Sequence, residues 1–224
     1  MMDSQKHAAR TGRDPRPLSG RRLNAAVREQ QIVQGAIQFF AEHGFEGRTR
    51  DLAEELGVTQ PLLYRYFPTK QSLIERVFRE VYLKPLESDL TSILCDRAKP
   101  LEQRLESFYI RYGETINRYE WTRIYIYAGL KGEDLNKSYT ELVETKILRV
   151  ICAELRAYCG LPGPDAIPIS ELELEHVWTL HGGLFYYSVR KHIYGARVSE
   201  DFGAIVRRTV AVMLEGTKAV AGKR

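Results

Sequence analysis

Apolar residues recur at intervals of three and four positions along most of the sequence, while alternation of apolar and polar residues is almost absent. The first spacing places apolar side chains on one face of an α-helix, whereas alternation would indicate a β-strand. We therefore expect an all-α protein. The pattern predicts helices at 24–43, 50–56, 59–66, 70–84, 100–116, 121–130, 135–158, 170–194 and 199–220.

Residues at the ends of these segments support several boundaries. Asn24 and Thr49 are candidate N-caps of the first two helices, because short oxygen-bearing side chains accept hydrogen bonds from free amide groups. Gly44 and Gly57 can adopt the left-handed conformation that ends a helix. Pro85 is expected to end the fourth helix, since proline has no N–H group and restricts the residue before it.

Composition is that of an ordinary globular protein, with 44% hydrophobic and 28% charged residues in 224. No apolar run approaches the roughly 18 residues of a membrane span. Residues 1–24 contain no apolar stretch that would form a secretion signal, so we expect a cytoplasmic protein without a membrane partner. Cys95, Cys152 and Cys159 form no CxxC pair, which argues against a disulfide framework and a zinc site.

Positive charge is concentrated at the start of the chain. Residues 1–24 contain six lysines and arginines against two aspartates, and this excess equals the net charge of +4 of the whole chain. We expect a flexible basic arm that follows a phosphate backbone or enters a minor groove. The alternative is a disordered tail that only aids solubility.

Two short helices joined by a turn at Gly57 follow a longer helix, which predicts a helix-turn-helix domain over residues 25–71. Its inward-facing residues are expected to be Leu52, Ala53, Leu56, Val58, Leu63 and Phe67. The second short helix then presents polar and aromatic side chains outward. Large tyrosines are costly to expose without a use, so we expect this face to meet a partner.

A recognition helix places its first residues at base edges in the major groove. Gln60 can bond to adenine through two hydrogen bonds, and Pro61 and Leu62 can meet a thymine methyl group. Other outward residues suit phosphate contacts, which set the register. The residues predicted to contact DNA are Arg48, Thr49, Arg50, Thr59, Gln60, Pro61, Leu62, Tyr64, Arg65, Tyr66 and Lys70. Arg48 and Arg50 could equally be solvated.

The run GVTQPLLYRYFPTK at 57–70 resembles the signature of the tetracycline-repressor (TetR) family, in which GV precedes a short recognition helix containing LY and an F-x-x-K closure. The run FFAEHGF at 39–45 resembles the end of that family's first helix. The resemblance covers about 50 residues, roughly Ala26 to Leu73. The connection between Gly44 and Asp51 is one residue shorter than usual, which leaves open which residue caps the second helix.

The resemblance implies a transcriptional repressor in which a larger helical domain, here 72–224, binds a small apolar or aromatic effector that releases the protein from a pseudo-palindromic operator. It also implies a homodimer formed by the last two helices. One alternative is an activator or a ligand-independent regulator. Another is a helical dimeric module that binds small molecules or proteins and has vestigial DNA contacts.

The sequence offers its own support for the dimer. A continuous apolar stripe runs along 199–220, and the preceding helix contains two adjacent glycines, which weaken a helix unless they allow close approach. Packing within one chain is the alternative. The predicted interface residues are Gly182, Gly183, Phe202, Ile205, Val206, Thr209 and Met213.

Aromatic residues are frequent between 109 and 127 and again between 178 and 187, and such rings can line a mostly apolar pocket. Core packing explains any one of them equally well, and His181 is more often a core or interface histidine. The predicted ligand-binding residues are Tyr112, Trp121, Tyr125, Trp178 and His181. No metal spacing, carboxylate pair, Ser-His-Asp order or phosphate loop is convincing, so we expect neither a cofactor nor an enzyme.

Overall fold

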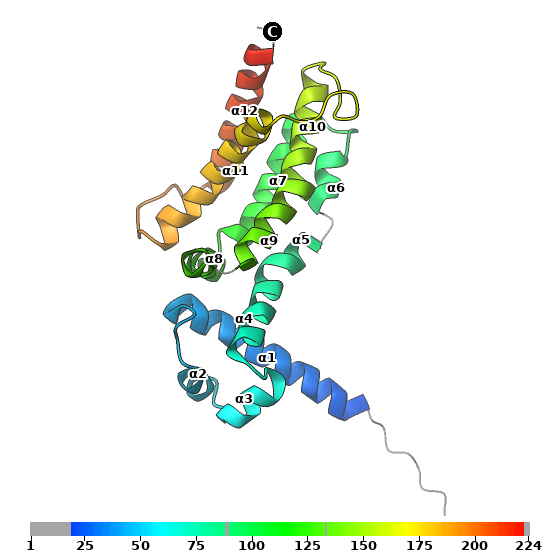
Figure 1. Cartoon of the computed structure of the whole chain (residues 1–224). Coiled ribbons are helices and arrows are strands. Elements are labelled where there is room, and N and C mark those ends of the chain that lie inside the picture. Colours follow the sequence, from blue (N-terminus) through cyan, green and yellow to red (C-terminus); the bar gives the residue numbers. More distant parts are fainter. Residues whose placement is uncertain (1–18, 88–89, 133, 222–224) are drawn as a thin grey trace, which may run out of the picture.

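The computed structural model describes residues 19–87, 90–132 and 134–221, and within these ranges it is helical without strands, so the predicted all-α class is confirmed. A small N-terminal bundle lies at one end of the molecule (Figure 1). It contains α1 (Ser19–His43), α2 (Thr49–Glu55), α3 (Gln60–Tyr66) and α4 (Lys70–Phe78).

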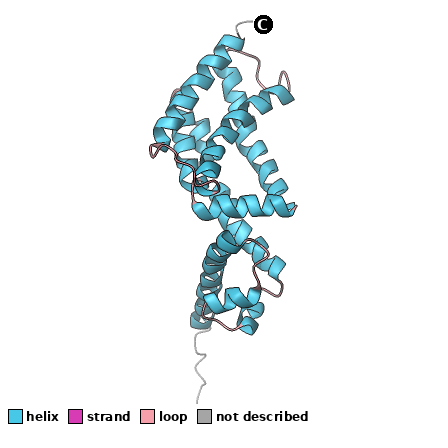
Figure 2. Ribbon diagram, turned by 90° about the vertical axis from the view of Figure 1, so that its left-hand side faces the viewer, coloured by secondary structure: helices cyan, strands magenta, loops and turns pink. Residues whose placement is uncertain are grey.

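A larger bundle occupies the other end, and the two lobes are also distinct in the perpendicular view (Figure 2). Two π-helical turns, η1 (Arg79–Leu83) and η2 (Glu144–Leu148), join helices end to end. The helices of the larger bundle are α5 (Lys84–Glu87), α6 (Leu90–Cys95), α7 (Leu101–Ile116), α8 (Tyr119–Lys131), α9 (Asp134–Val143), α10 (Arg149–Tyr158), α11 (Glu171–His192) and α12 (Phe202–Ala221). Of these, α5 and α6 were not predicted. No described helix is both long and apolar enough to cross a bilayer.

Pro85 does not end the fourth helix, contrary to expectation. The chain continues from α4 through η1 into α5, and Pro85 is the second residue of α5. In the π turn, the Lys84 amide donates to the Arg79 carbonyl, five residues back. The shift to π-type bonding places proline in the first turn of a new α-helical segment, where its missing N–H group costs little. One continuous rod therefore connects the two bundles.

Two predicted helix starts were also wrong. Helix α1 begins at Ser19, so Asn24 lies inside the helix and caps nothing; residues 1–18 of the predicted arm lie outside the described residues. Helix α2 begins at Thr49 itself, with Arg48 at the N-cap and no side-chain cap among the described residues. The Thr49 hydroxyl is instead bonded to two side chains of α3.

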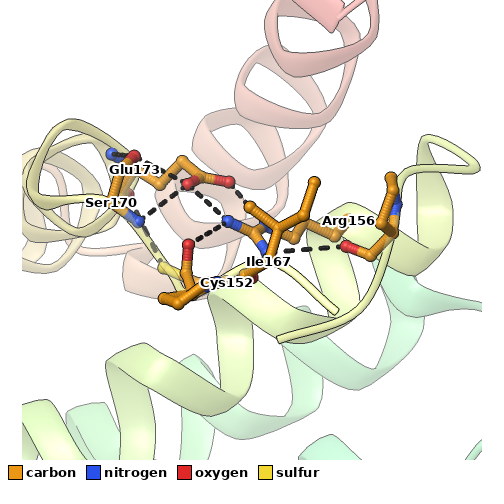
Figure 3. Close-up of polar contacts among 7 residues, drawn as sticks. Cys152, Arg156, Ile167, Ser170 and Glu173 are labelled. Atoms are coloured by element: carbon orange, nitrogen blue, oxygen red, sulfur yellow. Dashed lines mark hydrogen bonds and ion pairs between the residues drawn. The ribbon is translucent and has the colours of Figure 1, made fainter. Parts of the chain in front are cut away.

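A network of polar side chains attaches α11 to α10 at the far end of the larger bundle (Figure 3). Arg156 contacts both carboxylate oxygens of Glu173, at 2.7 and 2.8 Å, and also bonds the Ile167 carbonyl. Ser170 caps α11 in a reciprocal capping box with Glu173. The Arg156 guanidinium lowers the pKa of Glu173 to about 2. These contacts hold the 159–170 connection on the bundle.

Candidate nucleic-acid interface and ligand cavity

A buried apolar scaffold holds α3 at the surface of the N-terminal bundle. Leu52, Ala53, Leu63 and Phe67 are buried as predicted. Leu56 and Val58, also predicted to face inward, are half-buried and pack on the same core. Since Leu63 anchors one face of α3, the opposite face is turned toward solvent.

The start of α3 is defined by its cap and by a proline. Thr59 accepts a hydrogen bond from the Leu62 amide at 3.4 Å, and Pro61 lies in the first turn, where it fits helical geometry. Pro61 is exposed, Leu62 is half-buried, and the Tyr64 residue retains 39% of its accessible surface. The predicted reading surface is therefore accessible from outside the bundle.

Thr49, the first residue of α2, forms hydrogen bonds with two side chains of α3. Gln60 Nε2 donates to Thr49 Oγ1 at 3.2 Å, and the hydroxyl oxygens of Thr49 and Tyr64 are 3.0 Å apart. These three side chains, hereafter the Thr49 network, have a defined arrangement before any partner arrives.

Lys70 lies at the start of α4, beside the C-terminal end of α3. Thr69 caps α4 in a reciprocal capping box with Ser72. Partial burial is the largest influence on Lys70 and lowers its pKa, while the Glu46 carboxylate opposes this effect. A lysine at the beginning of a helix is well placed for an anion such as phosphate.

The two predicted arginines before and within α2 differ. Arg48 forms two contacts with Asp51, Nε to Oδ2 at 2.9 Å and Nη2 to Oδ1 at 3.2 Å. This ion pair raises the pKa of Arg48. Arg50 is exposed on α2. The structure thus gives Arg48 an internal partner.

A broad groove of about 910 Å³ separates the N-terminal half of α1 from α3. Arg28 lines it from α1, and Leu62, Arg65 and Tyr66 line it from α3. The Arg65 guanidinium lies over the Tyr66 ring, 5.5 Å from its centroid. Both walls therefore bring an arginine to one surface next to the predicted base-reading residues.

The five residues predicted to bind a ligand all line one cavity of about 90 Å³ in the larger bundle. They come from α7, α8 and α11, which are distant in sequence. The cavity is completed by Ile116, Tyr139, Thr140, Val143, Gly182 and Phe185. Tyr139 was missed because it shares the apolar face of its helix with ordinary core residues, and the sequence contains no signal that separates it from them.

The polar groups of this cavity are uncharged. The hydroxyl oxygens of Tyr112 and Tyr139 are 2.6 Å apart, and Tyr112 Oη is 3.4 Å from His181 Nε2. Burial lowers the pKa of His181 to about 4, so its ring is neutral at pH 7. His181 Nδ1 has no hydrogen-bond partner among the described residues. The described lining includes no lysine, arginine, aspartate or glutamate.

Tyr82 joins the cavity wall to the rod that leads into the N-terminal bundle. It is a fully buried residue of η1, and its hydroxyl donates to the Trp121 carbonyl at 2.6 Å. Its ring centroid lies 4.9 Å from that of Trp121 and 5.4 Å from that of Tyr139. Trp121 and Tyr139 of the cavity lining are therefore in direct contact with η1.

The apolar stripe of α12 was assigned wrongly in part. Val206 and Met213 are buried in the core of their own chain and offer almost no surface to a second subunit. The half-buried residues Ile205 and Phe202 pack on the same core. A Cβ atom added to Gly113 would lie 2.2 Å from the Phe202 ring, so α12 approaches α7 closely. The apolar stripe of α12 therefore packs on α7 of its own chain. The same face cannot also contact a second subunit.

A different face of α11 and α12 is exposed. Leu172 and Tyr186 on α11 retain 73% and 51% of their surface, and Val212 on α12 retains 68%. Gly183 is exposed as well, and a Cβ atom added there would meet no described atom within 4 Å. Gly182, the other predicted interface glycine, lines the cavity. Exposed apolar side chains of this size on two neighbouring helices are typical of an interaction surface.

Comparisons with known proteins agree with this geometry. Residues 32–77 match the model of bacterial regulatory proteins, tetR family. The HTH-type transcriptional repressor KstR2 of Mycolicibacterium smegmatis is 29% identical over 122 residues, which are 54% of this chain and 58% of that protein. The HTH-type transcriptional repressor AcnR of Corynebacterium diphtheriae is 39% identical over 56 residues, 25% of this chain and 30% of that protein.

These alignments span little more than half of KstR2 and less than a third of AcnR. Over the whole fold, the crystal structure of a tetR-family transcriptional regulator from Streptomyces coelicolor superposes with a TM-score of 0.61 at 18% identity, covering 88% of this chain and 83% of that one. The family match falls on α1 to α4, where the helix-turn-helix lies. The N-terminal bundle is thus similar in sequence to the tetR family of bacterial regulatory proteins, and the fold of the chain is similar to that of solved tetR-family regulators.

Proposed function

We propose that the protein is a sequence-specific DNA-binding transcriptional regulator, and specifically a repressor that acts as a homodimer. The observation that carries this proposal is the outward face of α3, where Tyr64 is exposed and Gln60 is half-buried, on the side away from the buried Leu63. The relatives KstR2 and AcnR are named transcriptional repressors, which supports the same assignment.

In this proposal the N-terminal bundle is the DNA-binding domain. Gln60, Pro61 and Leu62 contact base edges in the major groove, because they occupy the first turn of α3, where Pro61 is exposed and the other two are half-buried. The remaining predicted contacts, other than Thr49, go to phosphates and set the position of the helix without reading sequence. Arg48 is the weakest member of that set, because its guanidinium already pairs with Asp51.

A homodimer explains how so small a helix reaches useful specificity. Two copies of α3 in successive major grooves are about 34 Å apart and read a pseudo-palindromic site. The exposed face of α11 and α12, with Gly183, Tyr186 and Val212, supports a two-fold interface there. This face replaces the stripe of Val206 and Met213 expected from the sequence.

We further propose that a small, uncharged, aromatic or apolar effector binds at Tyr112, Trp121, Tyr125, Trp178 and His181. An ion buried against this lining would have no counter-charge, and that is costly. The cavity of about 90 Å³ is smaller than the roughly 150 Å³ that accommodates benzene, so binding must enlarge it. Enlargement displaces Tyr82 and η1 and favours a splayed dimer that no longer fits the operator.

The DNA-binding part is tested with operators selected from a random duplex library by the full-length protein. Lys70→Ala should weaken binding to all sequences alike and reduce the salt dependence by about one phosphate contact. Gln60→Ala should instead relax the preference at one base position. Unchanged operator binding by both variants would refute the assigned surface.

The small cavity volume favours one alternative, a regulator of the same DNA-binding class that needs no effector or acts as an activator. Gel shifts with neutral aromatic compounds separate this alternative from the effector-controlled repressor, because only the repressor should release DNA when such a compound is added. A helical dimeric module for small molecules or proteins, with vestigial DNA contacts, is the remaining candidate. If the protein is such a module, the wild type should bind all DNA sequences alike.

A further inference from the structure

Thr49 is unusual for a threonine at the start of a helix, because its hydroxyl takes no part in capping that helix in the described chain. The hydroxyl lies between α2 and α3 and bonds to two side chains of α3. It is half-buried, whereas Tyr64 beside it is exposed. This placement suits a group that organises its neighbours.

We propose that Thr49 is a positioning residue for base recognition: its hydroxyl sets the orientation of the Gln60 amide and links that amide to the phosphate contact of Tyr64. The inference rests on the proposed DNA-binding function. It assigns to Thr49 the control of which base Gln60 selects. Thr49 is not itself a base contact.

The amide orientation matters because the two ends of the Gln60 side chain differ chemically. One Nε2 hydrogen goes to Thr49 Oγ1, so Oε1 and the second Nε2 hydrogen remain for DNA. One acceptor beside one donor is the pattern that pairs with N6 and N7 of adenine. Without the Thr49 hydroxyl the amide can turn over and present its groups in the reverse order.

Tyr64 gives the network a direction once DNA is bound. Phosphate oxygens only accept hydrogen bonds, so Tyr64 must donate its hydroxyl hydrogen to them. The Tyr64 oxygen then accepts from Thr49, and Thr49 in turn accepts from Gln60. The three hydrogen bonds therefore run in one direction: Gln60 donates to Thr49, Thr49 donates to Tyr64, and Tyr64 donates to the phosphate. Contact with the backbone thereby reinforces the orientation that reads the base.

The experiment compares Thr49→Val, which keeps the branched shape and removes the hydroxyl, with Thr49→Ser, which keeps the hydroxyl. Thr145→Val, an exposed threonine of η2 in the larger bundle, is the matched control. Each full-length variant is assayed against the selected operator, against operators changed at single positions, and against random duplex. Circular dichroism melting confirms that each variant is folded.

The expected result is a loss of discrimination of about five-fold at one base position in Thr49→Val, the size of one neutral hydrogen bond. Affinity for random duplex should stay the same, and Thr49→Ser and Thr145→Val should match the wild type. Thr49→Val and Gln60→Ala should relax the same position, and the double variant should relax it no further than Gln60→Ala alone.

Two outcomes would overturn the inference while leaving the proposed function intact. The first is an unchanged base preference in Thr49→Val. The second is an equal loss of affinity for every sequence, which would make Thr49 a phosphate contact. A wild-type protein without any sequence preference would overturn the proposed function itself, together with this inference.

Nuclear magnetic resonance of the free protein provides a measurement that does not depend on an operator. The Gln60 side-chain amide signals, assigned by their absence in Gln60→Ala, should shift in Thr49→Val and keep their positions in Thr49→Ser. Identical signals in all three proteins would contradict the network. Thr49→Ala supplies a second removal of the hydroxyl if the valine variant does not fold.

Discussion

The two bundles use polar and aromatic side chains in opposite ways. In the N-terminal bundle the Thr49 network stands at the surface, over a core that includes Leu52 and Leu63. In the larger bundle the corresponding network of Tyr112, Tyr139 and His181 is buried, and the helices around it are longer. The first arrangement can meet a large partner immediately, whereas the second must open to admit even a small one.

This difference separates two kinds of recognition. A surface network of residues 11 to 15 positions apart is set by two short helices and one turn. The buried network joins residues up to 69 positions apart, so it depends on how α7, α9 and α11 pack. Tyr82, in the rod that leads to the N-terminal bundle, contacts Tyr139 of the buried network through its ring.

Replacing Tyr82 should therefore affect both bundles and have the largest effect. We expect Tyr82→Ala to lower the free energy of unfolding by about 3–5 kcal/mol, because it removes a fully buried aromatic ring. Tyr82→Phe, which loses only the bond to the Trp121 carbonyl, should cost about 1 kcal/mol. Urea unfolding measures both. A loss below 1 kcal/mol for the alanine variant would show that this ring contributes little to the packing around η1.

Acid should weaken the larger bundle through His181. The pKa of this buried group falls to about 4, against about 6.5 in an unfolded chain, so the unfolded chain binds more protons between those values. The stability that depends on neutral His181 is therefore fully present above about pH 6.5 and is lost progressively as the pH falls toward 4. We expect a loss of about 2 kcal/mol from pH 7 to pH 5.

His181→Gln is the control for this pH effect, because its side chain does not titrate. Urea unfolding at pH 7 and pH 5 should show a much smaller difference in this variant. The measurement goes no lower than pH 5, because Glu80 and Glu173, with pKa values lowered to about 2, lose most of their contribution to stability only at lower pH. Equal pH dependence in both proteins would exclude His181 as the cause.

The capping boxes of the two bundles permit a matched comparison of smaller effects. Thr69→Ala and Ser170→Ala should each cost about 1 kcal/mol, since each removes an N-cap. Ser170→Ala should cost more, because Ser170 also donates to the Glu173 carboxylate that binds Arg156. Thermal unfolding ranks them, with Thr69→Ser as the conservative control. The reverse ranking would mean that the Arg156 network does not depend on the cap.

The smallest expected effect concerns the two arginines at the start of α2. Arg48→Ala should leave the melting temperature unchanged, because its pair with Asp51 is exposed to solvent. It should also weaken operator binding less than Arg50→Ala does, since Arg48 already has a partner. Gel shifts at low salt measure the difference, and a larger effect at Arg48 would show that DNA displaces Asp51.

Short-range patterns predicted much of the N-terminal bundle. The turn at Gly57, Pro61 in the first turn of α3 and the inward position of Leu63 all follow from spacing within 20 residues, and the structure agrees with each. The same local logic failed at Pro85, where a π turn let the rod continue, and at Thr49, whose hydroxyl bonds across to α3. In both places a neighbouring element supplied an alternative that the sequence does not display.

The amino-acid sequence by itself determined the helical class, the position of the helix-turn-helix and which aromatic residues were available for a cavity. Tertiary structure alone decided that Tyr139 joins them, that Val206 and Met213 are buried within their own chain, and that the Thr49 hydroxyl bonds to side chains of α3. The reason is that periodicity specifies which face of a helix is apolar, while the identity of the opposing element depends on packing between segments far apart in the chain.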